Sequence, residues 1–202
     1  MLNLHKYYLK QWVFILVALS LTSCAFLRTH DNDSPKIKVF KNQWIQLPTP
    51  QALGLNVSAT QILSATYGKK TYSAQVQVEV TPQHIILVAL GGWGSELFSI
   101  DYNGETIKNS HLPMPNAQMG IQHTLTDFIF TYASPTLLRQ TLSSSKITFT
   151  VSPRQRVFSL NGKPIIQINY QYTDPWKGKV TLKNIALGYQ VNIKTIALKQ
   201  NQ

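Results

Sequence analysis

Alternating apolar and polar residues mark much of this chain as β-structure. From Tyr72 to Val80 every second residue is apolar and the residues between are polar, which predicts a strand with one wet and one dry face. Further strands are predicted over 84–90 and 96–102. Asn103-Gly104 then predicts a hairpin turn, because both residues tolerate positive φ, and 106–108 would be the returning strand.

The same period returns near the C-terminus. Ile147, Phe149 and Val151 alternate with polar residues, and a second Asn-Gly pair at 161–162 predicts another hairpin. Strands are expected over 156–160, 164–172, 179–184 and 189–198.

Helical spacing interrupts the strands between residues 113 and 142. Leu125, Phe128, Ile129 and Tyr132 fall on one helical face, and Ser134-Pro135 offers an N-cap followed by a proline, opening a second helix with Leu137 and Leu138. Residues 39–63 show no sustained period. They are interpreted as loop plus a short helix over 58–64, with Ser58 as its N-cap.

These elements predict a mainly β fold with some α-helix. Apart from the helical insertion, the links between strands are short, which favours a curved antiparallel meander over βαβ units. No internal repeat is evident, and one domain is expected over 39–202.

The N-terminal segment has the layout of a lipoprotein signal. Lys6 and Lys10 precede an apolar run, and small residues precede Cys24, the only cysteine of the chain. Residues 1–23 are therefore expected to be a removed signal peptide, because Leu21-Thr22-Ser23-Cys24 resembles the lipobox whose cysteine carries acyl chains such as palmitate. An ordinary signal with an incidental cysteine is the alternative. The polar residues up to 38 are expected to form a flexible tether.

The net charge and the residue after Cys24 add to the lipoprotein interpretation. The formal net charge is +11, and loss of the signal removes two lysines and no acid, which leaves +9. Such a basic surface attracts anionic lipid or an acidic protein, or serves solubility alone, while export argues against nucleic acid. Ala25 follows Cys24 where an aspartate would indicate retention in the inner membrane. An outer-membrane, periplasm-facing anchor is therefore favoured.

No local motif indicates catalysis or metal binding. His30, His84, His111 and His123 lack the spacing of metal ligands, and no phosphate-binding loop or dinucleotide fingerprint is present. The letters S-x-x-K occur at residues 143–146, but they follow a helix where an acylating serine would open one. A non-enzymatic protein with no catalytic residue, metal or cofactor is expected.

Two apolar features stand out instead. Gly91-Gly92-Trp93-Gly94 places an indole at the tip of a glycine-rich turn, where it would either probe lipid or a partner protein, or fold back as a plug of the core. The helical insertion would cover the open side of the curved sheet. That arrangement encloses either a packed core or a hydrophobic cavity.

Several segments resemble a known family. They are Leu87–Gly94 with Leu97-Phe98, Ser134–Arg139, Tyr172–Trp176 and Leu182–Tyr189. With these residues the chain resembles the uncharacterised LolB-like outer-membrane lipoproteins, often encoded with aryl polyene biosynthesis genes. The resemblance implies an unclosed β-barrel capped by helices and an apolar cavity for acyl chains. It also implies a projecting apolar loop, here Gly91, Gly92, Trp93 and Gly94, and so favours the exposed interpretation of Trp93.

The resulting functional expectation is a carrier or receptor for a lipoprotein, lipid or aryl polyene, served by a LolA-like periplasmic carrier. The candidate cavity residues are Leu125, Phe128, Ile129, Tyr132, Leu137 and Leu138. The alternative is a non-catalytic scaffold that holds a complex at the membrane.

Overall fold

The computed structural model describes residues 34–40, 42–111 and 117–201. The predicted signal peptide, Cys24 and most of the predicted tether lie outside these residues. Residues 32–202 form one compact unit with a hydrophobic core of its own. The domain therefore contains what it needs to fold alone, and it is described by itself below.

Two antiparallel meanders build most of this domain. The first runs through β3 (Val57–Tyr67), β4 (Lys70–Val80), β5 (Ile85–Leu90), β6 (Glu96–Tyr102) and β7 (Ile107–His111). The second runs through β8 (Ile147–Ser152), β9 (Gln155–Leu160), β10 (Lys163–Tyr170), β11 (Lys179–Asn184) and β12 (Tyr189–Gln200).

Pairing between β12 and β3 fuses the meanders into one ten-stranded sheet of order β7-β6-β5-β4-β3-β12-β11-β10-β9-β8. Its edge strands, β7 and β8, do not pair with each other, so the sheet stays open. The predicted mainly β class, the antiparallel meander and the unclosed sheet are confirmed.

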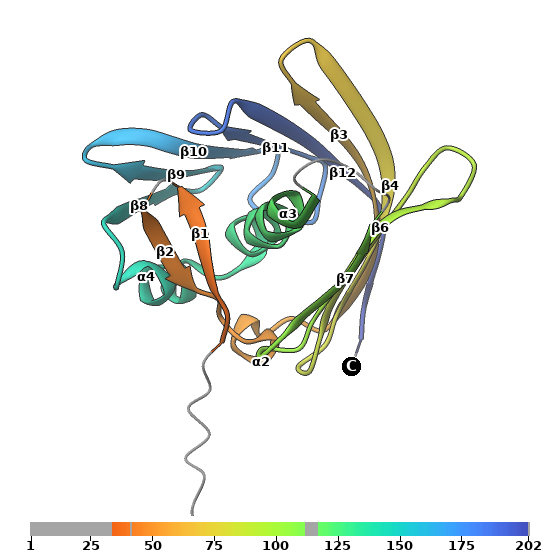
Figure 1. Cartoon of the computed structure of the whole chain (residues 1–202), viewed down its shortest axis with the longest axis horizontal. Coiled ribbons are helices and arrows are strands. Elements are labelled where there is room, and N and C mark those ends of the chain that lie inside the picture. Colours follow the sequence, from red (N-terminus) through yellow and green to blue (C-terminus); the bar gives the residue numbers. More distant parts are fainter. Residues whose placement is uncertain (1–33, 41, 112–116, 202) are drawn as a thin grey trace, which may run out of the picture. The chain divides into compact units, whose positions relative to one another are not determined.

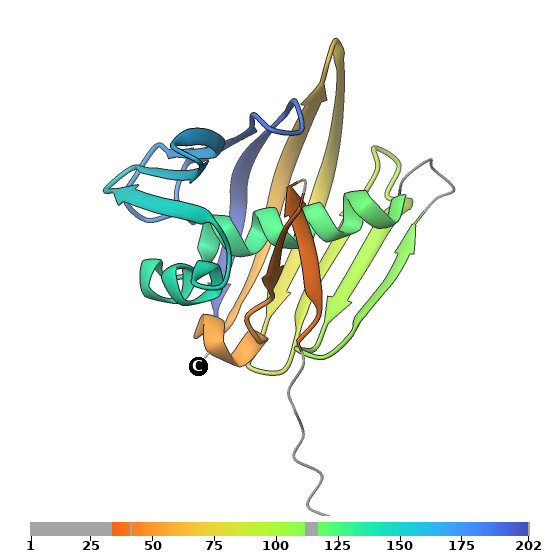
Figure 2. The same cartoon turned by 60° about the vertical axis from the view of Figure 1, so that its left-hand side comes forward.

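The remaining elements lie inside the curve of this sheet or beside its open side (Figures 1 and 2). They are the β1 (Lys36–Phe40) and β2 (Gln43–Gln46) hairpin and the helices α2 (Pro50–Leu53), α3 (Ala117–Tyr132) and α4 (Pro135–Leu142). Helix α3 crosses the concave side, where Phe130 stacks on Phe158 of β9 with ring centroids 4.3 Å apart. Among the described residues, no helix combines the length and apolar character needed to span a membrane.

Local signals placed several element ends correctly. Ser134 caps α4, since its hydroxyl accepts a hydrogen bond from the Leu137 N–H at 3.2 Å. Asn161 and Gly162 both have positive φ, 51° and 74°, which allows the tight turn between β9 and β10. The Asn103 side chain accepts hydrogen bonds from the backbone N–H groups of Glu105 and Thr106, closing the other Asn-Gly turn.

The helix predicted over 58–64 is wrong, because these residues belong to β3. Gln61 interrupts the alternation of apolar and polar residues that predicts a strand. It is buried between buried Ala59 and partly buried Leu63, at a position where an apolar residue would have continued the pattern. Its amide is satisfied there, since Gln61 Nε2 donates to the Tyr132 hydroxyl at 2.7 Å and to Thr195 Oγ1 at 3.1 Å. The actual short helix is α2, capped by Thr49.

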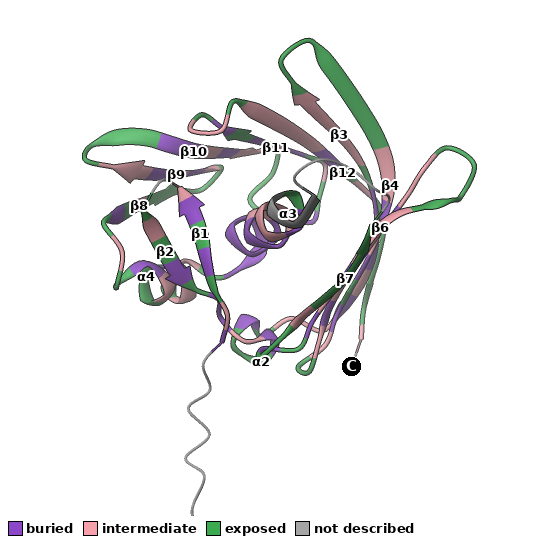
Figure 3. Cartoon of the chain, viewed as in Figure 1, coloured by how far each residue is buried: buried purple, intermediate pink, exposed green. Residues whose placement is uncertain are grey.

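The β1–β2 hairpin was also missed. Lys36 begins β1 inside the segment expected to be tether, and β2 lies in the segment interpreted as loop. Ile37, Val39, Ile45 and Leu47 are all at most 2% exposed, so this hairpin contributes a full apolar face to the core. Residues coloured as buried lie on α3, on this hairpin and along the strands of the sheet (Figure 3).

Truncating the aromatic stack between α3 and the sheet tests the described core. Phe130→Ala in the 32–202 domain is expected to lower the free energy of unfolding by about 3–5 kcal/mol, because a buried phenyl ring leaves a cavity. Ile196→Ala, at a 54% exposed position, should change the free energy of unfolding by less than about 0.5 kcal/mol. Urea unfolding followed by circular dichroism measures both; equal effects would contradict the packing.

Candidate functional site

The loop between β5 and β6 presents Trp93 with its side chain 100% exposed. Two backbone hydrogen bonds close the loop, from Gly91 N–H to the Ser95 carbonyl at 2.8 Å and from Gly94 N–H to the Gly91 carbonyl at 2.9 Å. Gly94 has φ +75°, a conformation that other residues rarely adopt. The glycines thus shape a tight turn that holds the indole away from the core, and Trp93 is not a core plug.

Strand register places three turns at the same end of the sheet. Leu90 at the end of β5 pairs with Gln75, from which β4 runs back to the β3–β4 turn. Tyr189 at the start of β12 pairs with Tyr67 at the end of β3. We call this end the rim; it carries the β3–β4 turn (68–69), the Trp93 loop (91–95) and the β11–β12 turn (185–188).

The candidate cavity residues lie in the core. Leu125, Phe128, Ile129, Tyr132 and Leu138 are buried and Leu137 is partly buried. Tyr132 stacks on Trp176 with ring centroids 3.9 Å apart, and Phe128 meets the same indole edge-on at 6.3 Å. These side chains therefore belong to the packed core, and a cavity among them stays a prediction.

Polar side chains from the sheet hold the C-terminal half of α3. Arg156 on β9 donates to the Phe130 carbonyl at 2.7 Å, and the Tyr170 hydroxyl on β10 donates to the Thr131 carbonyl at 2.8 Å. Both carbonyls belong to the last turn of the helix, where no backbone N–H within the helix satisfies them. A guanidinium there also interacts favourably with the negative end of the helix dipole.

A carboxyl group ties the middle of α3 to the rim. The Tyr189 hydroxyl donates to Asp127 Oδ2 at 2.6 Å and accepts a hydrogen bond from Asn184 Nδ2 at 3.1 Å. Burial raises the pKa of Asp127 to about 7, against a smaller lowering by the Tyr189 hydrogen bond. Burial also lowers the pKa of His123, one helical turn earlier.

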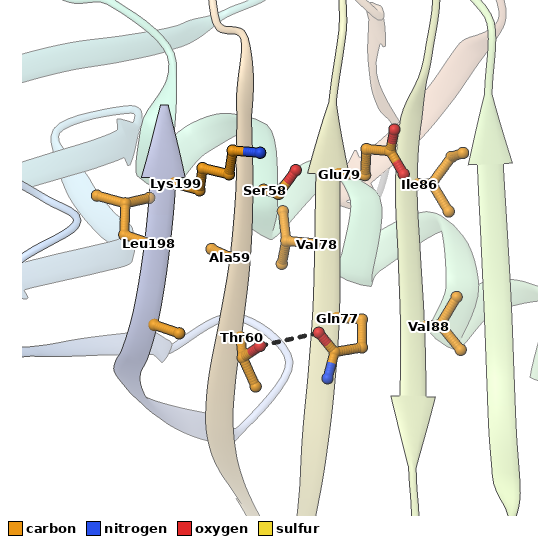
Figure 4. A pocket seen from close by; sticks show the side chains of 11 residues that line it. Ser58, Ala59, Thr60, Gln77, Val78, Glu79, Ile86, Val88, Leu198 and Lys199 are labelled. Carbon is orange, nitrogen blue, oxygen red and sulfur yellow. Dashed lines mark hydrogen bonds between the residues drawn. The ribbon is translucent and has the colours of Figure 1, made fainter. Parts of the chain in front are cut away.

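Two open hollows of the described structure lie elsewhere. The larger, about 420 Å³, opens on the outer face of β12, β3, β4 and β5, where Thr60 Oγ1 donates to Gln77 Oε1 at 2.9 Å (Figure 4). The smaller, about 250 Å³, lies between α4 and β8 beside Arg139 and Phe149. Neither is lined by any candidate cavity residue.

One further polar pair, between a histidine and an aspartate, was not indicated by the sequence. His84 Nδ1 lies 2.6 Å from Asp101 Oδ1, between partly exposed side chains on neighbouring strands. Residues 143–146 form the turn between α4 and β8, as predicted for the S-x-x-K letters. Within the described ranges, no group of three or more His, Cys, Asp or Glu residues could hold a metal ion.

The polar anchors of α3 escaped sequence reasoning. Gln61, Asp127, Arg156 and Tyr189 lie far apart along the chain, and each looks like a surface residue within its own segment. The inward positions follow only from strand register, which the misassigned β3 obscured. Arg156 carried a usable signal, since it alternates with partly buried Val157 and stands in phase with buried Phe158.

Titration of Asp127 predicts how stability depends on pH. Because its pKa is raised, the folded state holds a proton that the unfolded state loses near pH 4. The free energy of unfolding should therefore fall as pH rises from about 4 to about 7, by up to about 1.4 kcal/mol per pH unit. Asp127→Asn, which still accepts from Tyr189, should flatten this dependence in urea unfolding at several pH values. A variant with an unchanged slope would contradict the assignment.

Comparison with known proteins identifies a family and a likeness to solved structures. No curated protein matches the chain. A crystal structure from Vibrio parahaemolyticus, of a domain provisionally named an outer membrane lipoprotein-sorting protein, aligns with 75% of this chain and 88% of its own. The TM-score is 0.36 and the sequence identity 8%. The family model for a protein of unknown function, DUF3261, matches residues 58–197, which is most of the chain and nearly all of the large sheet. The chain therefore belongs to the DUF3261 family.

Proposed function

We propose that this protein is a non-catalytic carrier or receptor for a hydrophobic cargo in the cell envelope. Acylated Cys24 would anchor it to the outer membrane with the domain facing the periplasm. The cargo would be an acylated protein, a lipid or an aryl polyene. A LolA-like carrier would deliver it.

The observation that carries this proposal is the full exposure of Trp93 on a closed glycine turn. A tryptophan side chain covers roughly 150–250 Å². At about 25 cal/mol per Å², leaving it in water forgoes roughly 4–6 kcal/mol of burial free energy. Insertion of the indole into a lipid interface recovers part of that energy, which makes the loop suited to meet a membrane or a lipid-bearing partner.

The cargo site would be the concave face of the sheet beneath α3. Leu125, Phe128, Ile129 and Tyr132 of α3 already belong there to one apolar core with buried residues of the strands. Cargo would take their place against the sheet as α3 shifts outward. Two hydrogen bonds favour such a hinge, because Arg156 and Tyr170 hold the last turn of α3 against the sheet. Residues 122–124, nearer the start of the helix, are only partly buried.

Transfer between apolar sites needs no energy source of its own. An acyl chain leaving one apolar groove for another keeps nearly the same buried area, so the step is close to balanced and follows the relative affinities. Arrival at the outer membrane, near Trp93, would then complete the route.

One observation favours a second candidate, a scaffold that holds a protein complex at the membrane. The interior is filled by aromatic side chains, including the Phe130–Phe158 and Tyr132–Trp176 stacks. A core that stays closed would leave the outer face and the rim as the working surfaces.

Cargo binding distinguishes the two candidates. The 32–202 domain is expected to bind a fluorescent fatty acid, and Leu125→Glu should weaken that binding at least about 10-fold because it places a charge on the apolar face of α3. Urea unfolding verifies that the variant folds. If it does not fold, Phe128→Ala, which removes apolar contact without adding charge, replaces it. A wild-type domain that binds neither fatty acid nor lipopeptide would leave only the scaffold.

The role of Trp93 is tested by delivery into membranes. Trp93→Glu should slow transfer of a fluorescent lipopeptide from the domain to vesicles by about 10-fold or more, without changing its affinity for the lipopeptide. Trp44→Glu is the matched control, since Trp44 is a second exposed indole, 53% accessible, on β2. Transfer that is unchanged in Trp93→Glu, or slowed equally in both variants, contradicts a membrane role for this loop.

A further inference from the structure

The β3–β4 hairpin extends well past its neighbour on one side. β5 pairs with β4 only from Gln75 onward, whereas β3 and β4 stay paired as far as Tyr67 and Lys70. We call residues 63–74 the projecting hairpin; it stands out at the rim in Figure 1. Gly68, with φ +59°, lies in its turn.

The two faces of the projecting hairpin differ in chemistry. On the outer face, hydroxyl groups pair across the strands, Ser64 with Ser73 and Thr66 with Thr71, each at 3.0 Å. The inner face continues the core surface outward. By register it carries Leu63, Ala65, Tyr67, Tyr72 and Ala74, with Lys70 opposite Tyr67 at its outer end.

Exposure increases along that inner face toward the tip. Leu63 and Ala74 still pack against the core, but Tyr67 is 66% exposed and Tyr72 is 63% exposed. Tyrosine has an apolar ring and a polar hydroxyl, which suits it to the boundary between lipid headgroups and acyl chains. The apolar strip therefore ends in two side chains matched to a membrane interface.

Positive charge surrounds this tip. Lys69 is exposed in the turn, and Lys70 is exposed at the start of β4. Exposed Lys183 lies two strands away, in the row of residues that includes Thr66. Most acidic residues of the described part lie toward the opposite ends of their strands or in the turns there, namely Glu79, Asp101, Glu105 and Asp174. Glu96 is the exception, because it begins β6 at the rim beside the Trp93 loop. Among the described residues the rim still carries more exposed lysines, Lys69, Lys70, Lys163 and Lys183, than exposed acids.

From this geometry we propose that the projecting hairpin binds an anionic lipid surface. Tyr67 and Tyr72 enter the interface, and Lys69 and Lys70 meet the lipid phosphates. Trp93 emerges from the same rim on the neighbouring β5–β6 loop, so both elements contact one bilayer. This contact goes beyond the proposed carrier function, because it orients the domain on the membrane whether or not cargo is bound.

Vesicle binding by the 32–202 domain tests the proposal. The domain should bind vesicles of phosphatidylcholine with about 30 mol% phosphatidylglycerol more tightly than vesicles of phosphatidylcholine alone. Combining Lys69→Gln and Lys70→Gln should weaken binding to the anionic vesicles roughly 30-fold, since each lysine near such a surface contributes about a 5-fold factor. Tyr67→Ser with Tyr72→Ser should weaken binding to both kinds of vesicle, and the matching Phe substitutions should largely preserve it.

A matched pair of lysines controls for net charge. Lys179 and Lys199 are also exposed but lie at the opposite ends of β11 and β12 from the rim. Changing both to Gln should alter vesicle binding less than about 3-fold. The proposal is overturned if both double variants lose vesicle binding equally, or if the Lys69→Gln, Lys70→Gln variant loses none. Fatty-acid binding by the hairpin variants should stay at the wild-type level, so failure of this surface is distinguishable from failure of the carrier function.

Discussion

One constraint governs this domain: an open, strongly curved sheet must cover the apolar concave face that it cannot close upon itself. Buried side chains of helix α3 and of the β1–β2 hairpin contribute to the core, and two aromatic side chains of α3 stack on Phe158 and Trp176. The backbone carbonyls in the last turn of α3 and the Asp127 carboxyl would destabilise the core if they lacked hydrogen-bond partners. Arg156 and Tyr170 donate to the carbonyls, and Tyr189 donates to Asp127, each from a different strand. The sheet thus holds the helix through a few specific polar contacts as well as by apolar packing.

This arrangement explains which elements could be predicted from the sequence and which could not. Where one strand face is apolar and the other polar, as in β4, period and turn residues located the element to within a few residues. They failed at β3, because inward-facing Gln61 is satisfied only by Tyr132 and Thr195, which are distant in sequence. The β12–β3 pairing and the position of α3 depended on that strand. The same limit applied to the candidate site. The Trp93 turn could be predicted from neighbouring residues in the sequence, whereas the contacts of Tyr189 with Asp127 and Asn184 could be found only from the folded structure.

The rim links the structural and functional arguments. A fully exposed indole, two exposed tyrosines and two lysines occupy one end of the sheet, while most acids of the described residues occupy the other. Asp127, which bonds to Tyr189 at the rim, has a pKa near neutrality. The charge of the carboxyl in this hydrogen bond therefore changes with pH near 7. Membrane contact and helix displacement would therefore occur at the same end of the molecule.

The central claim is that the concave face beneath α3 accepts a hydrophobic guest. Native mass spectrometry of the domain, purified from cells without detergent, tests this most directly. The account predicts a second population heavier by the mass of one lipid or polyene, which disappears when Leu125 is replaced by Glu. A single population at the mass of the polypeptide, unchanged after incubation with excess lipopeptide, would contradict it.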